Sequence, residues 1–226
     1  MPAKSSGILV ALAWPDTYCK GTGAWYDSLA EKIGLSKNSY YRVGHAALIL
    51  INTLDGAAEY FDFGRYHCPP GKGRVRSART DHDLTLRFRA RLKEDGQLEN
   101  LSDLVEELSG MPQCHGEGPL IAAQSLINYP KSRGYIADLE AKELITYGPF
   151  VQNGSNCARF VMSTLDHGFE QFNWRLFLAK YPSPMPLLLV RSLGSTCLFP
   201  SQNITKYPLS WKIKPTVLRT QKAIQK

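Results

Sequence analysis

Residues 44–51 read Gly-His-Ala-Ala-Leu-Ile-Leu-Ile, with a histidine at the start of a continuous apolar run. Leu-Asp-Gly-Ala at 54–57 is a strong turn signal, and residues 59–63 predict the returning arm of a hairpin. Residues 8–14 form another apolar run of strand length. These segments predict a sheet with buried central strands.

The rest of the pattern adds helices to this sheet. Residues 84–92 alternate apolar side chains with arginine or threonine, which predicts a half-exposed strand. Residues 120–127 fit either a strand or a helix. Helices are expected over residues 22–33, 100–109, 136–145 and 155–166. The sequence thus predicts an α+β fold, a small and mostly antiparallel sheet with packed helices.

Size and composition favour one domain. The chain has 226 residues, of which 43% are hydrophobic and 11% aromatic, enough for a sizeable core. We expect a single domain over residues 1–200, followed by a basic C-terminal extension over residues 201–226.

Cysteine usage indicates free thiols. The five cysteines lie far apart without a CxxC pair, and a chain of this length does not need a disulfide framework. The apolar run at 7–14 is too short to cross a membrane, and no small-residue cleavage site follows it. We therefore expect no transmembrane segment and a reducing cytoplasmic location, in which a free thiol is available.

The charge balance is basic, with a formal net charge of +7 and a pI near 9.1. Such a balance suits nucleic acid, an anionic envelope or acidic lipid headgroups. No block of lysine and arginine is interleaved with stacking aromatics, and part of the excess lies in residues 212–226. A solvated surface is the favoured interpretation, and no nucleic-acid partner is expected.

Residues 153–161 read Asn-Gly-Ser-Asn-Cys-Ala-Arg-Phe-Val and place Cys157 where a polar loop becomes a helix. A thiol at a helix N-terminus has a lowered pKa, and Ser155 or Asn156 can cap that helix. His45 at the start of its strand can accept and return a proton. Each residue alone is more often structural, Cys157 as a small buried side chain and His45 as a hydrogen-bonded strand residue.

Taken together, the two segments resemble the papain-like cysteine hydrolases of the NlpC type in their circularly permuted form, a group that includes the lecithin retinol acyltransferase-like enzymes. The resemblance covers roughly residues 40–65 and 150–167. It implies a permuted papain-like catalytic domain with Cys157 as nucleophile and His45 as general acid/base. It also implies a polar third residue on the next strand, an acyl-enzyme mechanism, and no metal or organic cofactor.

Two residues compete for the third position. Glu59 is preferred because it lies where the family has its polar residue, and Asp62 is second. A two-residue hairpin loop puts Tyr60, Asp62 and Tyr66 on the His45 face, whereas a three-residue loop with a glycine bulge puts Glu59 there. The third residue would hold the imidazole in the correct tautomer.

Four residues are expected to contact a substrate: Trp14, Tyr66, Asn156 and Arg65. Trp14 precedes a loop whose aromatic side chains can wall a cleft, although core packing is the more ordinary role. Arg65, with Arg74 and Arg76, can bind a carboxylate or phosphate, but a solvated basic loop is the favoured interpretation.

Two histidine–cysteine pairs, His67-Cys68 and Cys114-His115, allow a weaker hypothesis of a tetrahedral zinc site. Structural zinc sites usually have ligands at CxxC or HxxxH spacing, which is missing here, so no metal is expected.

The function that the sequence favours is a cysteine hydrolase or acyltransferase. It would cleave an amide, ester or thioester bond in a peptide, amide or lipid-acyl substrate, in the manner of a peptidase or amidase. The alternatives are a non-enzymatic binding or regulatory module that keeps the fold, and a zinc-stabilised nucleic-acid-binding protein. The sequence carries no signal for an oligomeric state.

Overall fold

The computed structural model describes residues 6–21, 36–37, 40–114, 116–170, 173–180, 183–194 and 196–199. The helix expected at 22–33 and the extension expected at 201–226 lie outside these residues. The domain boundary at residue 200 therefore stays a prediction.

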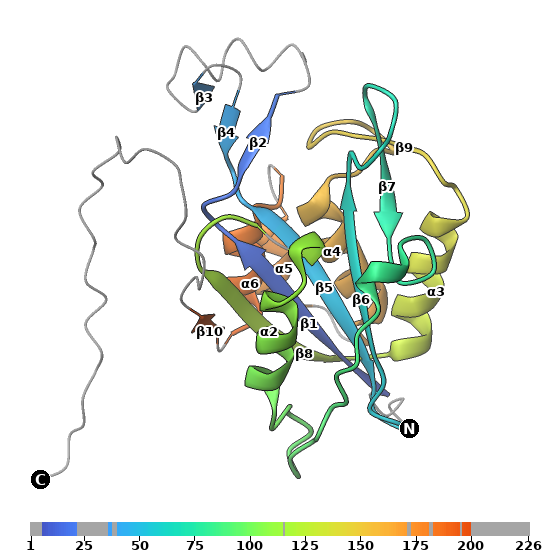
Figure 1. The fold of residues 1–226 in the computed structure, drawn as a ribbon, viewed down its shortest axis with the longest axis vertical. Helices are drawn as coiled ribbons and strands as arrows, with labels where there is room; N and C mark the ends of the chain where they lie inside the picture. The colour runs from blue at the N-terminus through green and yellow to red at the C-terminus, as the bar shows by residue number, and fades with distance from the viewer. Residues whose placement is uncertain are drawn as a thin grey trace, which may run out of the picture.

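A seven-stranded antiparallel sheet forms the centre of the molecule (Figure 1). Its strands follow the order β10-β8-β1-β5-β6-β7-β9. Their bounds are Thr196–Phe199, Leu120–Ile127, Gly7–Trp14, His45–Asn52, Ala58–Gly64, Lys72–Arg76 and Ile145–Thr146 in that order. The expected α+β fold with an antiparallel sheet is confirmed.

A small three-stranded sheet lies beyond one end of the large one. It consists of β2 (Tyr18–Lys20), β4 (Tyr40–Arg42) and β3 (Ser36–Lys37) in that order. Figure 1 shows it above the point where β1 ends and β5 begins. The Nη2 atom of Arg65 donates to the carbonyl of Lys20 at 2.6 Å, which ties the small sheet to the end of β6.

Helices and loops cover both faces of the large sheet. On one face lie α3 (Tyr129–Glu140), α4 (Cys157–Gly168), α5 (Trp174–Ala179) and α6 (Pro186–Ser192), and on the other lies α2 (Leu101–Ser109). Residues of β5 alternate between two cores, so that Leu48 packs on the α4 side and Ile49 on the α2 side. Burial on both faces explains why β1 and β5 are apolar throughout.

The β5–β6 hairpin fixes which side chains share a face with His45. Residues 53–56 form its loop, closed by a hydrogen bond from the Asn52 N–H to the Ala57 carbonyl. A four-residue loop preserves the same alternation as a two-residue loop, so Ala47 lies opposite Asp62 and Leu50 opposite Glu59. Asp62 therefore lies on the His45 face and Glu59 on the other.

Two expected elements differ from the structure. Residues 84–92 do not form a strand. Their backbone N–H groups bond to side chains of the α2 region instead: the Phe88 N–H to Glu107 at 2.7 Å and the Arg91 N–H to Asn100 at 2.8 Å. The helix expected at 136–145 begins earlier, at Tyr129, because Asn128 caps it and proline occupies the first turn.

Candidate active site

The first turn of α4 carries Cys157. Asn156 is the N-cap, and its side chain accepts a hydrogen bond from the Arg159 N–H at 2.8 Å. The guanidinium of Arg159 reaches back to the carbonyls of Gly148 and Val151, at 3.1 and 2.8 Å. The loop and the helix start are therefore held together, and the thiol lies at the positive end of the helix dipole.

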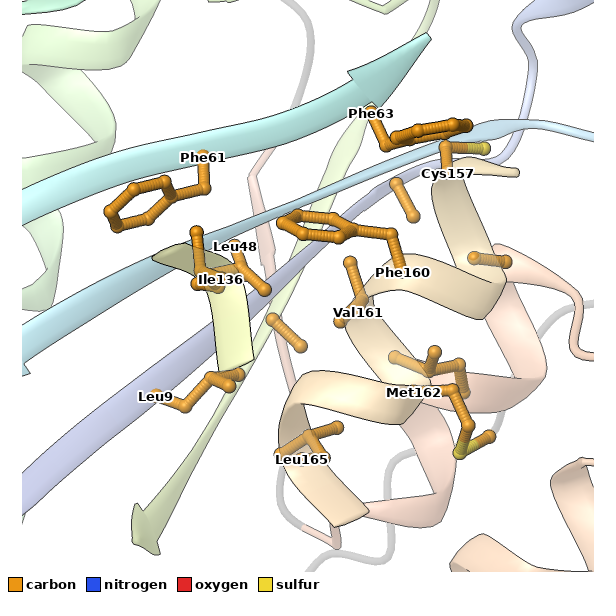
Figure 2. Close-up of a cluster of buried hydrophobic side chains, with 14 of the residues drawn as sticks. Leu9, Leu48, Phe61, Phe63, Ile136, Cys157, Phe160, Val161, Met162 and Leu165 are labelled. Carbon is orange, nitrogen blue, oxygen red and sulfur yellow. The ribbon is translucent and has the colours of Figure 1, made fainter. Parts of the chain in front are cut away.

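The rest of α4 fastens this helix to the sheet. Figure 2 shows the Cys157 side chain beside the ring of Phe63, and Phe160, Val161 and Leu165 along the same helix facing the core. Phe63 and Phe160 stack with ring centroids 6.2 Å apart. Cys157 itself is 7% exposed, at the margin of this core.

His45 is the first residue of β5. It lies opposite Trp14, the last residue of β1, and the two rings stack at 5.8 Å between centroids. Gly44, immediately before it, has φ of +80°, and its N–H donates to the Thr17 carbonyl at 3.1 Å. A glycine in this left-handed conformation lets the chain turn sharply into the strand.

The structure brings Cys157, His45 and Asp62 together from α4, β5 and β6. The imidazole interacts electrostatically with both the Cys157 thiol and the Asp62 carboxylate. The His45 Nε2 atom lies 3.7 Å from Oδ2 of Asp62, whose side chain is fully buried. This is the order of nucleophile, base and orienting acid that a thiol triad requires.

The electrostatics of the group favour a thiolate–imidazolium pair. Burial alone would raise the pKa of Cys157, but His45 and the backbone N–H groups of Ala46 and Ala158 stabilise the anion, so the pKa falls below its ordinary value. Burial alone would lower the pKa of His45, but Asp62 and Cys157 raise it to about 10. Both shifts favour a nucleophilic thiolate on Cys157 beside a proton donor on His45.

Asp62 is surrounded by hydrogen-bond donors. Arg76 binds it through two bonds, Nε to Oδ1 at 2.9 Å and Nη2 to Oδ2 at 2.6 Å. The hydroxyls of Tyr60 and Tyr66 donate to Oδ2 at 3.0 and 3.1 Å. Burial would raise the pKa of Asp62, but its bonds with His45 and Arg76 hold the pKa below its ordinary value. The carboxylate is thus an oriented anion.

Glu59, the residue preferred from the sequence as the third member, does not lie at this site. Its carboxylate accepts hydrogen bonds from the Tyr129 hydroxyl at 2.6 Å and from Nε of Arg133 at 3.2 Å, both on α3. The preference is corrected because the loop length, which the sequence left open, places Glu59 on the opposite face from His45. Asp62, the second choice, lies beside His45 instead, and its role as the third residue stays a prediction.

The four residues expected to contact substrate lie around the site in different roles. The buried ring of Trp14 stacks on His45, and Asn156 caps α4. Tyr66 directs its hydroxyl at Asp62, and exposed Arg65 lies over the ring of Tyr147 at 5.2 Å. Their contact with a substrate stays a prediction.

Two arginines considered as anion-binding groups are bound within the protein. Arg76 is the partner of Asp62, and Arg74 forms two bonds of 2.7 Å with Asp81. The sequence did not indicate the Arg76–Asp62 pair. A signal was present in the strand pattern, since antiparallel pairing of β6 and β7 sets Asp62 opposite Arg76.

The pairs considered for zinc do not form a site in the part of the chain that the structure describes. The Cys68 thiol donates to the Tyr66 carbonyl, and buried Cys114 has a pKa raised to about 12 by burial. The described residues contain no group of three or more histidine, cysteine or acidic side chains that could hold a metal ion. His115 lies outside those residues, and all five cysteines are free thiols.

Comparison with known proteins places the chain in a family. The sequence profile described as type VI secretion system effector TseH-like matches residues 9–174, well over half of the chain. The chain belongs to the TseH-like effector family. The fold is similar to the crystal structure of the type VI secretion system effector TseH, with a TM-score of 0.55 and 18% identity, covering 87% of this chain and 100% of that one. No curated protein gives a significant match.

Membership in the TseH-like family corrects the expected location. A cytoplasmic location was inferred because the sequence lacks a recognisable secretory signal peptide, but type VI effectors are secreted out of the producing cell. Among the described residues, no helix is both long and apolar enough to cross a membrane.

Proposed function

We propose that this TseH-like effector is a cysteine hydrolase or acyltransferase that cleaves an amide, ester or thioester bond through an acyl-enzyme. The observation that carries the proposal is the grouping of Cys157, His45 and Asp62, which places a thiol of lowered pKa beside a proton donor and a buried anion. The resemblance to permuted papain-like hydrolases of the NlpC type supports the same roles.

In the first half-reaction, the Cys157 thiolate attacks the carbonyl carbon of the substrate. Negative charge moves to the carbonyl oxygen, where N–H groups of the first turn of α4, which lack partners within the helix, can stabilise it. The His45 imidazolium gives its proton to the leaving amine, alcohol or thiol. The bond to the leaving group breaks, and a thioester remains on Cys157.

In the second half-reaction, neutral His45 takes a proton from water or from an acyl acceptor. The activated oxygen or amine attacks the thioester, the C–S bond breaks, and the product leaves with the acyl group. Asp62, whose Oδ2 lies 3.7 Å from Nε2 of His45, stabilises the charged form of the imidazole throughout. The Cys157 thiolate and the His45 imidazolium are restored, so no cofactor is consumed.

The proposed substrate class follows from the resemblance to NlpC-type hydrolases and from membership in the effector family. Relatives in the wider hydrolase group act on peptidoglycan-type peptides or on lipid acyl groups, and an effector acts outside the cell that makes it. A peptide amide is the favoured substrate, and an acyl lipid is the second. Trp14 stacks on His45, and Arg65, at the end of β6, bonds to the Lys20 carbonyl; these are the side chains we expect to contact the bound chain.

The experiment combines turnover with trapping of the intermediate. The full chain is incubated with bacterial peptidoglycan, and separately with an acyl-lipid vesicle and a p-nitrophenyl acyl ester. Cys157→Ala and His45→Ala are the test variants, and Cys68→Ala is a matched control in which a half-buried thiol away from α4 is removed. Released products and intact protein mass are both recorded.

We expect wild type and Cys68→Ala to release product and to carry a transient acyl group on Cys157. Cys157→Ala should lose both signals, and His45→Ala should lose at least a hundredfold in rate, as removal of a general acid/base does. Product release that survives in Cys157→Ala would contradict the proposal. No turnover of any substrate, together with an unreactive Cys157, would favour a binding module instead.

A further inference from the structure

Arg76 is the last residue of β7 and lies directly opposite Asp62 in the antiparallel pairing. Its fork donates two hydrogen bonds to the carboxylate, and the two side chains are 10% and 0% exposed. The pair is therefore almost fully removed from water. A buried bidentate pair of this kind fixes the plane of the carboxylate as well as its position.

The guanidinium is fixed from other sides too. It lies 3.5 Å from the centre of the Tyr66 ring, and its Nη2 atom also donates to the Gln113 carbonyl at 2.9 Å. The Tyr66 hydroxyl returns to Asp62, so the ring that supports Arg76 also binds its partner. Arg76 reaches the triad through its two bonds to Asp62.

We propose that Arg76 is a positioning residue: it holds Asp62 as an oriented anion beside His45 and, through Asp62, maintains the thiolate–imidazolium pair. The inference rests on the proposed function. A carboxylate this deeply buried would take up a proton without a cation beside it. A neutral Asp62 would no longer stabilise charged His45, and Cys157 would then lose the imidazolium that stabilises its thiolate.

Other groups also face these titrating side chains. Asp62 is approached by His45 from β5, by Tyr60 and Tyr66 from β6 and the turn after it, and by Cys114 from the 3-10 turn Pro112–Cys114. Among the described residues, Arg76 is the cationic side chain that is hydrogen-bonded to Asp62.

On the other side of the triad, Cys157 is faced by His45, by Cys19 from β2 and by Tyr66. Burial raises the pKa of the Cys19 and Cys114 thiols to about 12. It also raises the pKa of the Tyr60 and Tyr66 hydroxyls above their ordinary value. These thiols and phenols are therefore neutral at pH 7. They do not replace the charge of Arg76.

The test follows His45 by NMR in the full chain with ring-labelled histidine, assigned with His45→Ala. Alkylation of Cys157 by iodoacetamide is measured over the same pH range by mass spectrometry. Arg76→Gln removes the charge, and Arg76→Lys keeps the charge but not the fork. Arg74→Gln is the matched control, because Arg74 lies two residues earlier on β7 and binds Asp81 instead of Asp62.

In wild type we expect His45 to titrate near 10. In Arg76→Gln its midpoint should fall by about one pH unit or more, and the midpoint of Cys157 alkylation should rise by a similar amount. Arg76→Lys should recover most of both shifts, and Arg74→Gln should match wild type. A folded Arg76→Gln protein with wild-type midpoints would overturn the inference.

A second pair of variants covers the case in which Arg76→Gln does not fold. Asp62→Asn and the double variant Asp62→Asn/Arg76→Gln are compared, because the double variant leaves no buried charge unpaired. If Arg76 acts through Asp62, their midpoints coincide; a further shift in the double variant would overturn the inference. A wild-type Cys157 that titrates as an ordinary thiol would instead overturn the proposed function, so the two failures are distinguishable.

Discussion

Gly44 controls how His45 enters the sheet. Its φ is +80°, and a Cβ added there would lie 3.0 Å from the Trp14 carbonyl oxygen and 3.2 Å from Cα of Pro15. Both neighbours are backbone atoms, so they cannot rotate away as a side chain would. The residue before the base is thus constrained by conformation and by space.

Gly44→Ala should therefore lower the free energy of unfolding by about 2 kcal/mol or more, since left-handed strain alone costs roughly 1–2 kcal/mol. It should also slow the alkylation of Cys157, because His45 moves. Gly71→Ala is the control: Gly71 has φ of +75° but nothing within 4 Å of the added Cβ. Urea unfolding and iodoacetamide kinetics measure both effects. Equal losses of stability in the two variants would contradict the steric argument.

The residues of the site were predictable to different degrees. Cys157 and His45 could be proposed because each lies in a short local pattern, a polar loop before a helix and a strand start. The choice between Glu59 and Asp62 depended on the length of a loop, which sequence alone left open. The role of Arg76 depended on the pairing of β6 with β7, a contact between strands that composition does not reveal.

At the scale of elements, α4 both carries and polarises Cys157, the proposed nucleophile. The N-cap side chain of Asn156 satisfies the Arg159 N–H, and the Ala158 N–H stabilises the Cys157 thiolate. Loss of the cap would loosen the first turn, in which these N–H groups are aligned.

Asn156→Ala should cost about 1 kcal/mol of stability and raise the pH at which Cys157 becomes reactive. Asn128→Ala is the matched control, because Asn128 caps α3 in the same way through the Lys131 N–H. It should cost a similar free energy and leave the reactivity of Cys157 unchanged. Urea unfolding and alkylation rates separate the two effects. An unchanged thiol in Asn156→Ala would show that the cap does not serve the site.

The elements themselves were predicted best where burial is simple. The apolar runs of β1 and β5 are buried on both faces and matched the expected strands closely. Residues 84–92 have the alternation of a strand, but their backbone groups bond to Glu107 and Asn100. Periodicity describes which side chains are buried and does not specify where the backbone finds its partners.

At the scale of the molecule, the site lies where the large sheet, the small sheet and α4 meet. It depends on a buried ion pair, Asp62 with Arg76, inside a core that covers both faces of the sheet. Burial opposes the charge of Asp62, but His45 and Arg76 hold its pKa below the unfolded value. Its contribution to stability is therefore present above the unfolded pKa and is lost as the pH falls through the folded pKa.

Wild type should consequently lose stability more steeply than Asp62→Asn as the pH falls below about 4, the ordinary range for an aspartate. Urea unfolding at a series of acidic pH values measures this slope. Asp138→Asn removes an exposed carboxylate of α3 and should keep the wild-type slope. If the slopes of wild type and Asp62→Asn agreed, the buried carboxylate would not contribute to acid sensitivity.

The cellular location is the property of the whole protein that the sequence predicted wrongly. The α+β fold followed from residue patterns, but the location did not: the match to a type VI effector family overturned it. Family membership supplied what no residue pattern carried.

The proposed thiolate–imidazolium pair is tested most directly by the pH dependence of Cys157 alkylation by iodoacetamide. The rates are compared between wild type and His45→Ala, and mass spectrometry resolves them by site. Exposed Cys197 is the internal reference for the reagent. We expect Cys157 to become reactive well below the free-thiol pKa of about 8.5, and its reactivity to return towards that value in His45→Ala. A Cys157 that is unreactive at neutral pH, or indifferent to the loss of His45, would contradict the proposed pair.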